Sequence, residues 1–465
     1  MIALRFDQLA AVTGGQMYTA ADKGAAMFRG VSIDSRTLTD GELFVAIRGE
    51  KLDGHQFIPQ AIANGAAGVI AQYDYPALEQ LGQQVPVVVV QDSHEAMILL
   101  AKQYRHAIKA RFIGITGSNG KTTTKELTFR LIEAVEPTAY RSPGNLNNLF
   151  GVPLTLFKVP EACRVAVLEM GISTDVEMPR LAEIVEPDVV AITNVSATHL
   201  EFLGTVEAVA KAKLELVRSS RPNVPAIINA DDPVLMREAA KIRQNYITFG
   251  LHENADFHPD RYEVGENGVT TVVFEGHRFY LPLVGKHQVY NLTAAYASAR
   301  TLGYDYRIVN TEEIALETAP MRGQFVRRGG ARILVDCYNA NPENVKAGLA
   351  GFFAIGGKDR RVVVLGDMLE LGQDSPRYHR EIGAVLAQYR FDLAVFVGPR
   401  AADMLEGAAV AGVNRQHMRH YADAKSCATE ISDLIENNDL VYLKASRGIG
   451  LEEVLRGFGD AGEEK

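Results

Sequence analysis

Residues 112 to 124 read FIGITGSNGKTTT, an apolar run followed by a glycine-containing turn and then Lys-Thr-Thr. This order predicts a strand, a turn and the start of a helix, whose backbone N–H groups can surround a phosphate. Lys121 can reach the β- and γ-phosphates of a nucleotide, and the Thr122 hydroxyl can bind Mg²⁺. The sequence therefore predicts a nucleoside-triphosphate site. Its candidate residues are Gly117, Ser118, Asn119, Gly120, Lys121, Thr122 and Thr123.

The spacing of this loop departs from the standard phosphate-loop pattern. The pattern GxxxxGK[ST] would place its first glycine where this chain has Ile115, and the turn glycine here is Gly117. An ordinary strand–turn–helix with a surface lysine is the alternative interpretation. A Gly-Lys-Thr sequence directly after an apolar strand favours phosphate binding over that alternative.

Two residues that follow other apolar runs could complete a metal site beside the nucleotide. Glu169 ends the run VAVLE, and His199 follows the run VVAITNV. The ends of parallel strands beside a phosphate loop face the nucleotide, and carboxylate oxygens are ligands that Mg²⁺ prefers. The alternatives are a capping or surface carboxylate and a histidine that makes only structural hydrogen bonds.

The stretch Thr205 to Val217 reads TVEAVAKAKLELV and has the periodicity of an amphipathic helix. At about 100° per residue, Lys213 falls on the apolar face, whereas Lys211 points away from it. A lysine buried there would be costly unless it were paired or deprotonated. The side chain either reaches the surface, pairs with a carboxylate or borders a polar site, and periodicity alone favours the first.

The elements that must position these residues alternate between apolar strands and helices. Helices are predicted from Ser93 to Ala107 and from Tyr290 to Leu302, with a strand from Phe112 to Thr116 and a β-rich patch near 256–284. Strands that are apolar throughout indicate parallel sheets covered on both faces, so the fold class is α/β. We expect three domains: a small α/β N-terminal domain at 1–91, a central P-loop parallel-sheet ATPase domain at 92–318 and a C-terminal Rossmann-like domain at 319–465.

Composition limits the partners and the compartment. The net charge of -9 argues against a general nucleic-acid-binding protein. The N-terminal residues lack the pattern of a secretion signal, and no apolar run approaches the roughly 20 residues that span a bilayer. The three cysteines have no metal-ligand spacing and suit a reducing compartment. We expect a cytoplasmic monomer that neither binds nucleic acid nor inserts into a membrane.

Several of these motifs occur in the order found in one enzyme family. TGSNGKTTT, LEMGIS, ITNVSATHL and KAKLE follow one another as in the Mur ligases, the ATP-dependent amide ligases of peptidoglycan precursor synthesis, and the resemblance covers essentially the whole chain. The segment SIDSRTLTDGELFVAIRGEKLDGHQFIPQA resembles the uridine-nucleotide-binding domain of the later members. GNLNNLFGVPLT, DCYNANP and LGDMLELG resemble the member that adds D-alanyl-D-alanine to UDP-N-acetylmuramoyl-tripeptide.

The resemblance implies a reaction and its cofactors. ATP phosphorylates the terminal carboxylate of the UDP-linked tripeptide, and the amine of D-alanyl-D-alanine then displaces phosphate. Two Mg²⁺ ions would offset the phosphate charge. By motif, Thr122 and Glu169 hold the first ion, and His199 holds the second. Lys213 matches a lysine that CO₂ converts to a carbamate, which helps to position the second ion.

The resemblance also assigns nucleotide and substrate contacts. Asn291 matches an adenine-contacting asparagine, and Arg322 matches an arginine that reaches the phosphates from the third domain. Asp336 matches a ribose-binding aspartate, with Asn339 in the loop beside it. The family's usual KHN is KHQ here, and KASRGIGLE replaces the frequent KGSRSMxLE, so dipeptide contacts in that segment are expected only from its KxSR core. The candidate substrate residues are Ser35, Arg36, Asp53, His55, Asn145, Asn147, Lys444 and Ser446.

Other functions compete with the hypothesis of a D-alanyl-D-alanine-adding ligase. Another Mur-type amino-acid ligase would usually carry a DNPR-type motif if it added the third residue, and that string is absent from the sequence. A P-loop ATPase without ligase activity would not need the N-terminal DSR segment or the KAK helix. A non-catalytic nucleotide-binding descendant would not need to keep Lys121, Glu169, His199 and Lys213.

Overall fold

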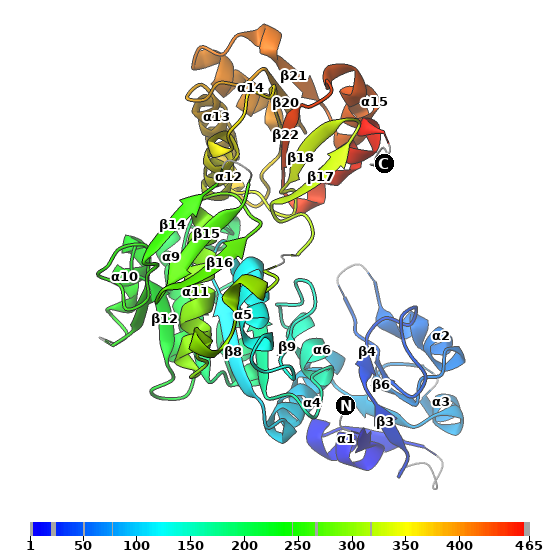
Figure 1. Ribbon diagram of the computed structural model, residues 1–465. Coiled ribbons are helices and arrows are strands. Elements are labelled where there is room, and N and C mark those ends of the chain that lie inside the picture. Colours follow the sequence, from blue (N-terminus) through cyan, green and yellow to red (C-terminus); the bar gives the residue numbers. More distant parts are fainter. Residues whose placement is uncertain are drawn as a thin grey trace.

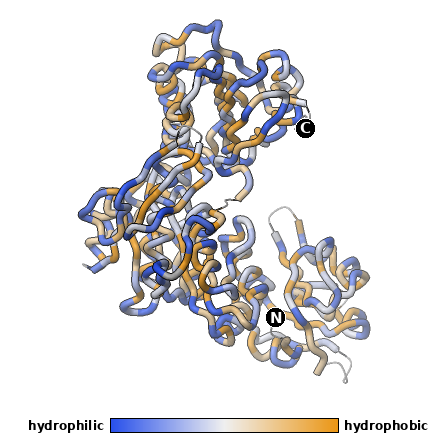
Figure 2. Tube along the Cα trace, in the orientation of Figure 1, coloured by the Kyte–Doolittle hydropathy of each residue, from blue (hydrophilic) through white to orange (hydrophobic). Residues whose placement is uncertain are grey.

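Short apolar runs form the strands of three large sheets, and each large sheet is the centre of one lobe of the chain. The computed structural model describes residues 3–19, 25–49, 52–76, 78–243, 245–265, 268–316 and 319–459. In Figure 1 the first lobe lies at the lower right, the central lobe at the left and the third lobe at the top. Figure 2 shows that hydrophobic segments follow the strands, whereas hydrophilic segments dominate the outer loops. The α/β fold class is confirmed.

The first lobe has a five-stranded sheet in the order β2-β7-β6-β5-β4. Only its edge strand β2 is antiparallel to its neighbour. β1 and β3 pair separately. The elements are β1 (Ala3–Arg5), α1 (Phe6–Thr13), β2 (Gln16–Tyr18), β3 (Met27–Arg29), β4 (Val31–Ser32), β5 (Leu43–Val45), α2 (Ile58–Ala63), β6 (Gly68–Gln72), α3 (Leu78–Gln84) and β7 (Val87–Val90).

The central lobe has a fully parallel six-stranded sheet in the order β13-β12-β11-β8-β10-β9. An antiparallel sheet, β14-β15-β16, confirms the predicted β-rich patch. The elements are α4 (Ser93–Ala107), β8 (Arg111–Thr116), α5 (Lys121–Glu133), β9 (Tyr140–Arg141), α6 (Gly151–Phe157), β10 (Val165–Glu169), α7 (Glu177–Val185), β11 (Val189–Ile192), α8 (Leu200–Leu203), α9 (Val206–Arg218), β12 (Ala226–Asn229), α10 (Pro233–Ala239), β13 (Ile247–Phe249), β14 (Arg261–Val264), β15 (Thr270–Phe274), β16 (His277–Leu281) and α11 (Lys286–Thr301).

The third lobe has a six-stranded sheet in the order β17-β18-β22-β19-β20-β21, parallel except for β17. Helices cover it as the Rossmann-like pattern predicts. The elements are β17 (Gln324–Arg328), β18 (Ala331–Val335), α12 (Pro342–Ala354), β19 (Arg361–Gly366), α13 (Ser375–Leu386), β20 (Leu393–Val397), α14 (Ala401–Val410), β21 (Met418–Tyr421), α15 (Ala424–Leu434) and β22 (Leu440–Lys444), followed by a 3₁₀ helix at Leu451–Phe458.

The predicted helix at 93–107 and the predicted strand before the phosphate loop are confirmed. The predicted start of the later helix at Tyr290 is wrong, because α11 already begins at Lys286. Gly285 precedes it with φ +110°, a conformation that glycine adopts without strain, so the chain turns directly into the helix there. The three predicted domain ranges each contain one large sheet, and their boundaries stay a prediction.

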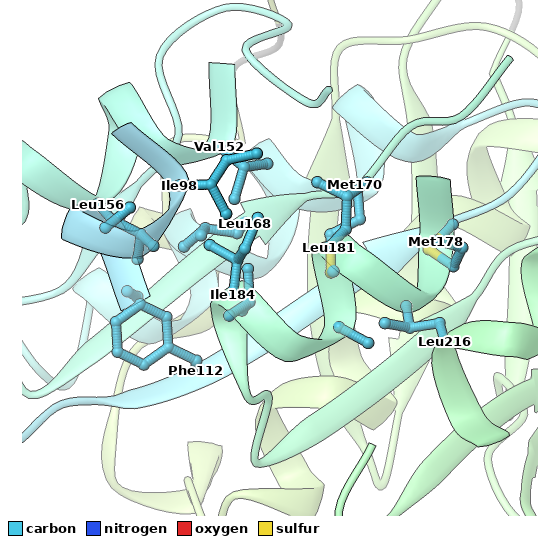
Figure 3. Close-up of a cluster of buried hydrophobic side chains, with 14 of the residues drawn as sticks. Ile98, Phe112, Val152, Leu156, Leu168, Met170, Met178, Leu181, Ile184 and Leu216 are labelled. Carbon is cyan, nitrogen blue, oxygen red and sulfur yellow. The ribbon is translucent and has the colours of Figure 1, made fainter. Parts of the chain in front are cut away.

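One continuous apolar core joins the first lobe to the central sheet. Figure 3 shows side chains from α4, α6 and α7 packed over β8 and β10, among them Ile98, Val152 and Leu181. The same cluster includes Phe6 and Leu9 of α1, which are fully buried. α4 therefore anchors the first lobe to the central lobe by apolar packing. Within the described residues, no helix is both long and apolar enough to cross a membrane.

Candidate active site

The predicted phosphate loop lies between β8 and α5, at the carboxyl end of the central parallel strand. β8 is flanked by β10 and β11, so the loop sits at the point where the strand order reverses. Gly120 has φ +80° and leaves no room for a side chain beside the Asn291 amide. Nζ of Lys121 donates to the carbonyl oxygens of Gly117 at 2.8 Å and Ser118 at 3.3 Å. Burial lowers the pKa of Lys121, while the carboxylate of Glu169 acts in the opposite direction.

The residues after β11 hold the tip of this loop. Asn194 accepts the Asn119 backbone N–H at 3.0 Å and donates its side-chain amide to the Asn119 carbonyl at 3.0 Å. The Thr193 hydroxyl donates to the same carbonyl at 2.6 Å. The segment after β11, the neighbour of β8 in the sheet, therefore fixes the loop conformation by hydrogen bonds within the protein, which is the preorganisation that phosphate binding requires.

Glu169 is buried at the end of β10 and faces the start of α5. The Thr122 hydroxyl donates to one of its carboxylate oxygens at 2.7 Å, and the Asn147 amide donates to the other at 2.8 Å. A hydroxyl and a buried carboxylate at this separation form a donor set that suits Mg²⁺. Across the described residues no cluster of three or more His, Cys, Asp and Glu side chains could hold a metal by itself. A metal here would need Thr122 and nucleotide oxygens as further ligands.

Lys213 is 1% exposed on α9, and Lys211 on the opposite face is exposed, as the helical phase predicts. The favoured expectation that Lys213 reaches the surface is wrong. Within the described part of the chain no carboxylate lies within ion-pair distance of its ammonium. Burial, and then the nearby charge of Lys121, lowers the pKa of Lys213 well below its usual value. Both causes favour the neutral amine over the ammonium.

The third lobe covers the phosphate loop. Nη2 of Arg322 donates to the Thr122 hydroxyl at 2.9 Å, and its guanidinium carbon lies 3.9 Å from the centre of the Tyr338 ring. Among the described residues the buried Nε of Arg322 has no hydrogen-bond partner, which fits an anionic ligand at this point. The Asn341 amide donates to the side-chain oxygen of Asn119 at 2.6 Å.

A cavity of about 290 Å³ lies between the central and third lobes. It brings together the predicted loop, metal, adenine and ribose residues, and Asn145 and Asn147 as well. Lys213 is not part of its lining. Residues that the sequence predictions missed are His287, Gln288, Tyr338, Asn344 and Arg447. Four of these lie within motifs that the sequence had already singled out: His287 and Gln288 in KHQ, Tyr338 in CYNANP and Arg447 in KASRG.

The adenine candidate Asn291 lies on the first turns of α11. Its side-chain amide donates to the side-chain oxygen Oε1 of Gln288 at 3.0 Å, so the glutamine that departs from the family pattern holds the asparagine. Burial lowers the pKa of the neighbouring His287 to about 4. His287 is therefore neutral at pH 7. Its Nε2 lies 3.0 Å from the Gln288 side-chain amide, which leaves Nδ1 as the ring nitrogen that can contact a base.

Two candidates for dipeptide contact have other partners. Nζ of Lys444 lies 2.7 Å from the Asp336 carboxylate and donates to the Asn339 carbonyl at 2.9 Å. The structure therefore places Lys444 with the ribose candidates. Ser446 does not line the cavity, and its hydroxyl accepts the Leu369 N–H at 2.9 Å.

The first-lobe candidates lie apart from the phosphate cavity. Asp53 and His55 line a separate hollow, with Nδ1 of His55 2.6 Å from the Asp53 carboxylate. Ser35 is buried and donates to Gln60 at 2.9 Å. Arg36 is exposed, and its guanidinium lowers the pKa of the Asp34 carboxyl to about 2. The structure does not bring these four candidates together with the phosphate loop.

A phosphate loop at the switch point of a parallel sheet, with a buried carboxylate beside it and a Rossmann-like lobe covering it, defines a multidomain P-loop nucleotide enzyme. Residues 27–105 match the profile "Mur ligase family, catalytic domain", residues 115–299 the Mur ligase middle domain, and residues 321–447 the profile "Mur ligase, glutamate ligase domain". The chain belongs to the Mur ligase family.

Full-length relatives narrow the comparison. The chain is 34% identical to the UDP-N-acetylmuramoyl-tripeptide–D-alanyl-D-alanine ligase of Bacillus subtilis over 92% of this chain and 93% of that protein. It is 30% identical to the Escherichia coli ligase of the same name over 99% and 100%. The crystal structure of MurF from Acinetobacter baumannii superposes with a TM-score of 0.86 at 28% identity, covering 98% of this chain and 99% of that one. MurF from Thermotoga maritima in complex with ADP gives 0.77 at 28% identity, covering 92% and 97%.

Proposed function

We propose that this chain joins D-alanyl-D-alanine to UDP-N-acetylmuramoyl-tripeptide with the hydrolysis of ATP to ADP and phosphate. The product would be UDP-N-acetylmuramoyl-pentapeptide, a precursor of peptidoglycan. Full-length similarity to ligases of that name supports the substrates. The contact of Arg322 with Thr122, beside the Glu169 carboxylate, is the observation that carries the ATP-dependent step.

The chain's own residues supply the electrostatic part of phosphoryl transfer. The backbone N–H groups of the phosphate loop, Lys121 and Arg322 surround the same cavity, and each offers positive charge to phosphate oxygens. Asn291 would contact adenine, and Asp336 and Asn339 would contact the ribose. The γ-phosphoryl group moves to the tripeptide carboxylate. The dipeptide amine then forms the amide bond as phosphate leaves, and the amine loses its proton to solvent.

Thr122, Glu169, His199 and a carbamylated Lys213 would hold two Mg²⁺ ions, which would offset phosphate charge in both steps. Lys213 is suited to this modification because burial lowers its pKa, which favours the neutral amine that reacts with CO₂. A neutral amine attacks CO₂, a N–C bond forms and one proton is released, leaving a carbamate anion. The new negative charge would be attracted to the positive charge of Lys121. The unmodified amine carries no negative charge and cannot make this interaction.

For the sugar-nucleotide, Ser35, Arg36, Asp53 and His55 of the first lobe are the proposed contacts. Asn145 and Asn147 would extend that site to the phosphate cavity, which they line. Lys444 and Ser446 stay candidates for dipeptide contact. They would act by ordering the chain segment in which they lie. One chain supplies all lobes of the cavity, so we expect a monomer. ATP and UDP-linked precursors are supplied in the cytoplasm, where we expect the enzyme to act.

ADP release tests the proposal directly. The enzyme is incubated with ATP and Mg²⁺ and with neither, one or both of the two substrates. We expect sustained release of ADP only when UDP-N-acetylmuramoyl-tripeptide and D-alanyl-D-alanine are both present. ADP formed at an equal rate without either substrate would favour a simple ATPase and contradict the proposal.

A further inference from the structure

Two side chains from different lobes meet beside the phosphate cavity, and their contact with each other has no role in the steps above. Nδ1 of His199, which lines the cavity, lies 2.7 Å from Oε2 of Glu370 in the third lobe. The ring N–H is not aimed squarely at the oxygen, but the distance is that of an ion pair, and the second torsion of a histidine is soft. Glu370 itself does not line the cavity.

We propose that Glu370 is a positioning residue that orients His199 for metal binding only when the third lobe is closed over the phosphate loop. This inference rests on the proposed metal role of His199. A carboxylate that receives one ring N–H leaves the other ring nitrogen as the available metal ligand and fixes the tautomer. Here the Glu370 carboxylate belongs to the third lobe and His199 to the central lobe. The tautomer of His199 is therefore linked to closure of the third lobe over the phosphate loop.

Both partners have an unusual backbone that presents the side chain. His199 has φ +53° and Glu370 has φ +61°, values in the left-handed region that residues other than glycine seldom adopt. Such a backbone is strained and persists where its surroundings enforce it, often at a functional site. Two left-handed residues that face each other across a lobe boundary indicate a built contact.

The loop that carries Glu370 is held firmly. It follows β19, and each of the three residues before Glu370 is tied to another element by a hydrogen bond. Glu370 is thereby supported from within its own lobe, whereas its carboxylate reaches out of it. The bonds are Ala401 N–H to the Asp367 carboxylate at 2.6 Å, Met368 N–H to the His379 ring at 3.0 Å and Leu369 N–H to the Ser446 hydroxyl at 2.9 Å.

The charge of Glu370 is suited to this task. Its carboxylate Oε2 lies 2.7 Å from the His199 ring, so a carboxylate oxygen is in place to accept the ring N–H. The charge of Lys121 also acts on this carboxylate. The carboxylate side chain is 53% exposed, so its replacement should leave folding intact. Ser446, a candidate for dipeptide contact from the sequence, instead supports the loop that carries Glu370.

The test measures Mn²⁺ binding by electron paramagnetic resonance with the full-length enzyme saturated with ADP. We expect Glu370→Ala to weaken Mn²⁺ binding about 10-fold, the range typical of groups that orient a ligand. Glu370→Gln, which keeps an acceptor oxygen, should have a smaller effect. Asp374→Asn is the matched control, because Asp374 is an acid of the same loop that pairs with Arg377 inside the third lobe. It should bind Mn²⁺ like the wild type.

A readout without metal follows the histidine itself. In ¹⁵N spectra of histidine-labelled, ADP-bound enzyme, with His199 assigned by His199→Gln, we expect a proton on Nδ1 in the wild type and loss of that preference in Glu370→Ala. If His199→Ala weakens Mn²⁺ binding but Glu370→Ala binds Mn²⁺ and shows the tautomer like the wild type, the inference fails alone. If His199→Ala binds Mn²⁺ normally, the metal role of His199 and the inference both fail, while ADP release still decides the ligase proposal.

Discussion

Nη2 of Arg322 and the hydroxyl of Thr122 lie 2.9 Å apart, although 200 positions separate them in the sequence. Thr122 also donates to Glu169, so its hydroxyl oxygen is the meeting point of a cation from one lobe and a carboxylate from another. The same oxygen is a proposed Mg²⁺ ligand. Closure of the third lobe therefore brings a fixed positive charge to the place where negative charge develops during phosphoryl transfer.

Replacement of Arg322 should remove that charge. We expect Arg322→Ala to lower kcat roughly 10²–10³-fold, by comparison with the loss of a single preorganised donor. Arg322→Lys should recover only part of the lost kcat, because the ammonium of lysine lacks the planar, forked set of N–H donors of a guanidinium. Steady-state ADP release measures both. Arg377→Ala removes an exposed arginine whose partner, Asp374, lies in its own lobe, and it serves as the control. Equal kcat in Arg322→Ala and Arg377→Ala would contradict the assignment.

Asn147 should act on the metal through Glu169. Its amide holds one carboxylate oxygen at 2.8 Å, so Asn147→Ala leaves that oxygen free to rotate away. We expect the half-saturating Mg²⁺ concentration to rise about 10-fold. Asn145→Ala is the matched comparison, since Asn145 lines the same cavity. It should raise KM for the UDP-tripeptide and leave the Mg²⁺ dependence unchanged. A reversed pattern, with Mg²⁺ dependence altered only in Asn145→Ala, would exclude this role.

Lys213 should destabilise the fold in a way that depends on pH. Its folded pKa lies well below the unfolded value of 10.5, so the unfolded chain binds more protons between those two values. Stability of the CO₂-free wild type therefore falls as pH falls through this window. Lys213→Met lacks that slope, and we expect it to be more stable at pH 7 by about 1–3 kcal/mol.

Urea unfolding at pH 7 and at pH 9.5 measures the difference in the free energy of unfolding between the wild type and Lys213→Met. This difference should be smaller at pH 9.5. Ligation should be lost in Lys213→Met at both pH values. A difference that grows with pH would contradict the burial of an unpaired amine. Bicarbonate added to the wild type should raise its stability at pH 7, because the carbamate anion is attracted to the positive charge of Lys121, whereas the unmodified amine is not.

Local sequence patterns predicted the parts of the site that depend on one element. The strand before Gly117, the helix start at Lys121 and the inward phase of Lys213 follow from periodicity and turn chemistry, and all three are found. Periodicity could not tell whether the buried face bordered a dry core or a polar site. That distinction depends on the position of Lys121 and on how separate elements pack. The surface position that periodicity alone favours for Lys213 is therefore wrong.

Contacts between lobes were beyond the reach of such patterns. Arg322 was assigned by resemblance to a family arginine, but its bond to Thr122 arises from how two sheets face each other. Glu370 lies in the LGDMLELG segment, but that segment gave no sign of a partner for it, because a glutamate in a loop is usually solvated. The pairing of Lys444 with Asp336 likewise depends on two strands, β18 and β22, that are neighbours in the sheet but far apart in sequence.

The most direct measurement follows one oxygen atom. UDP-N-acetylmuramoyl-tripeptide labelled with ¹⁸O in its terminal carboxylate is incubated with ATP, Mg²⁺, D-alanyl-D-alanine and enzyme, and the phosphate formed is analysed by mass spectrometry. Activation of the carboxylate by ATP transfers one carboxylate oxygen to phosphate and leaves the other in the new amide. We predict one ¹⁸O per phosphate and a UDP-pentapeptide that retains one. Phosphate free of ¹⁸O, formed at the same rate as ADP, would show hydrolysis by water and contradict the ligase account.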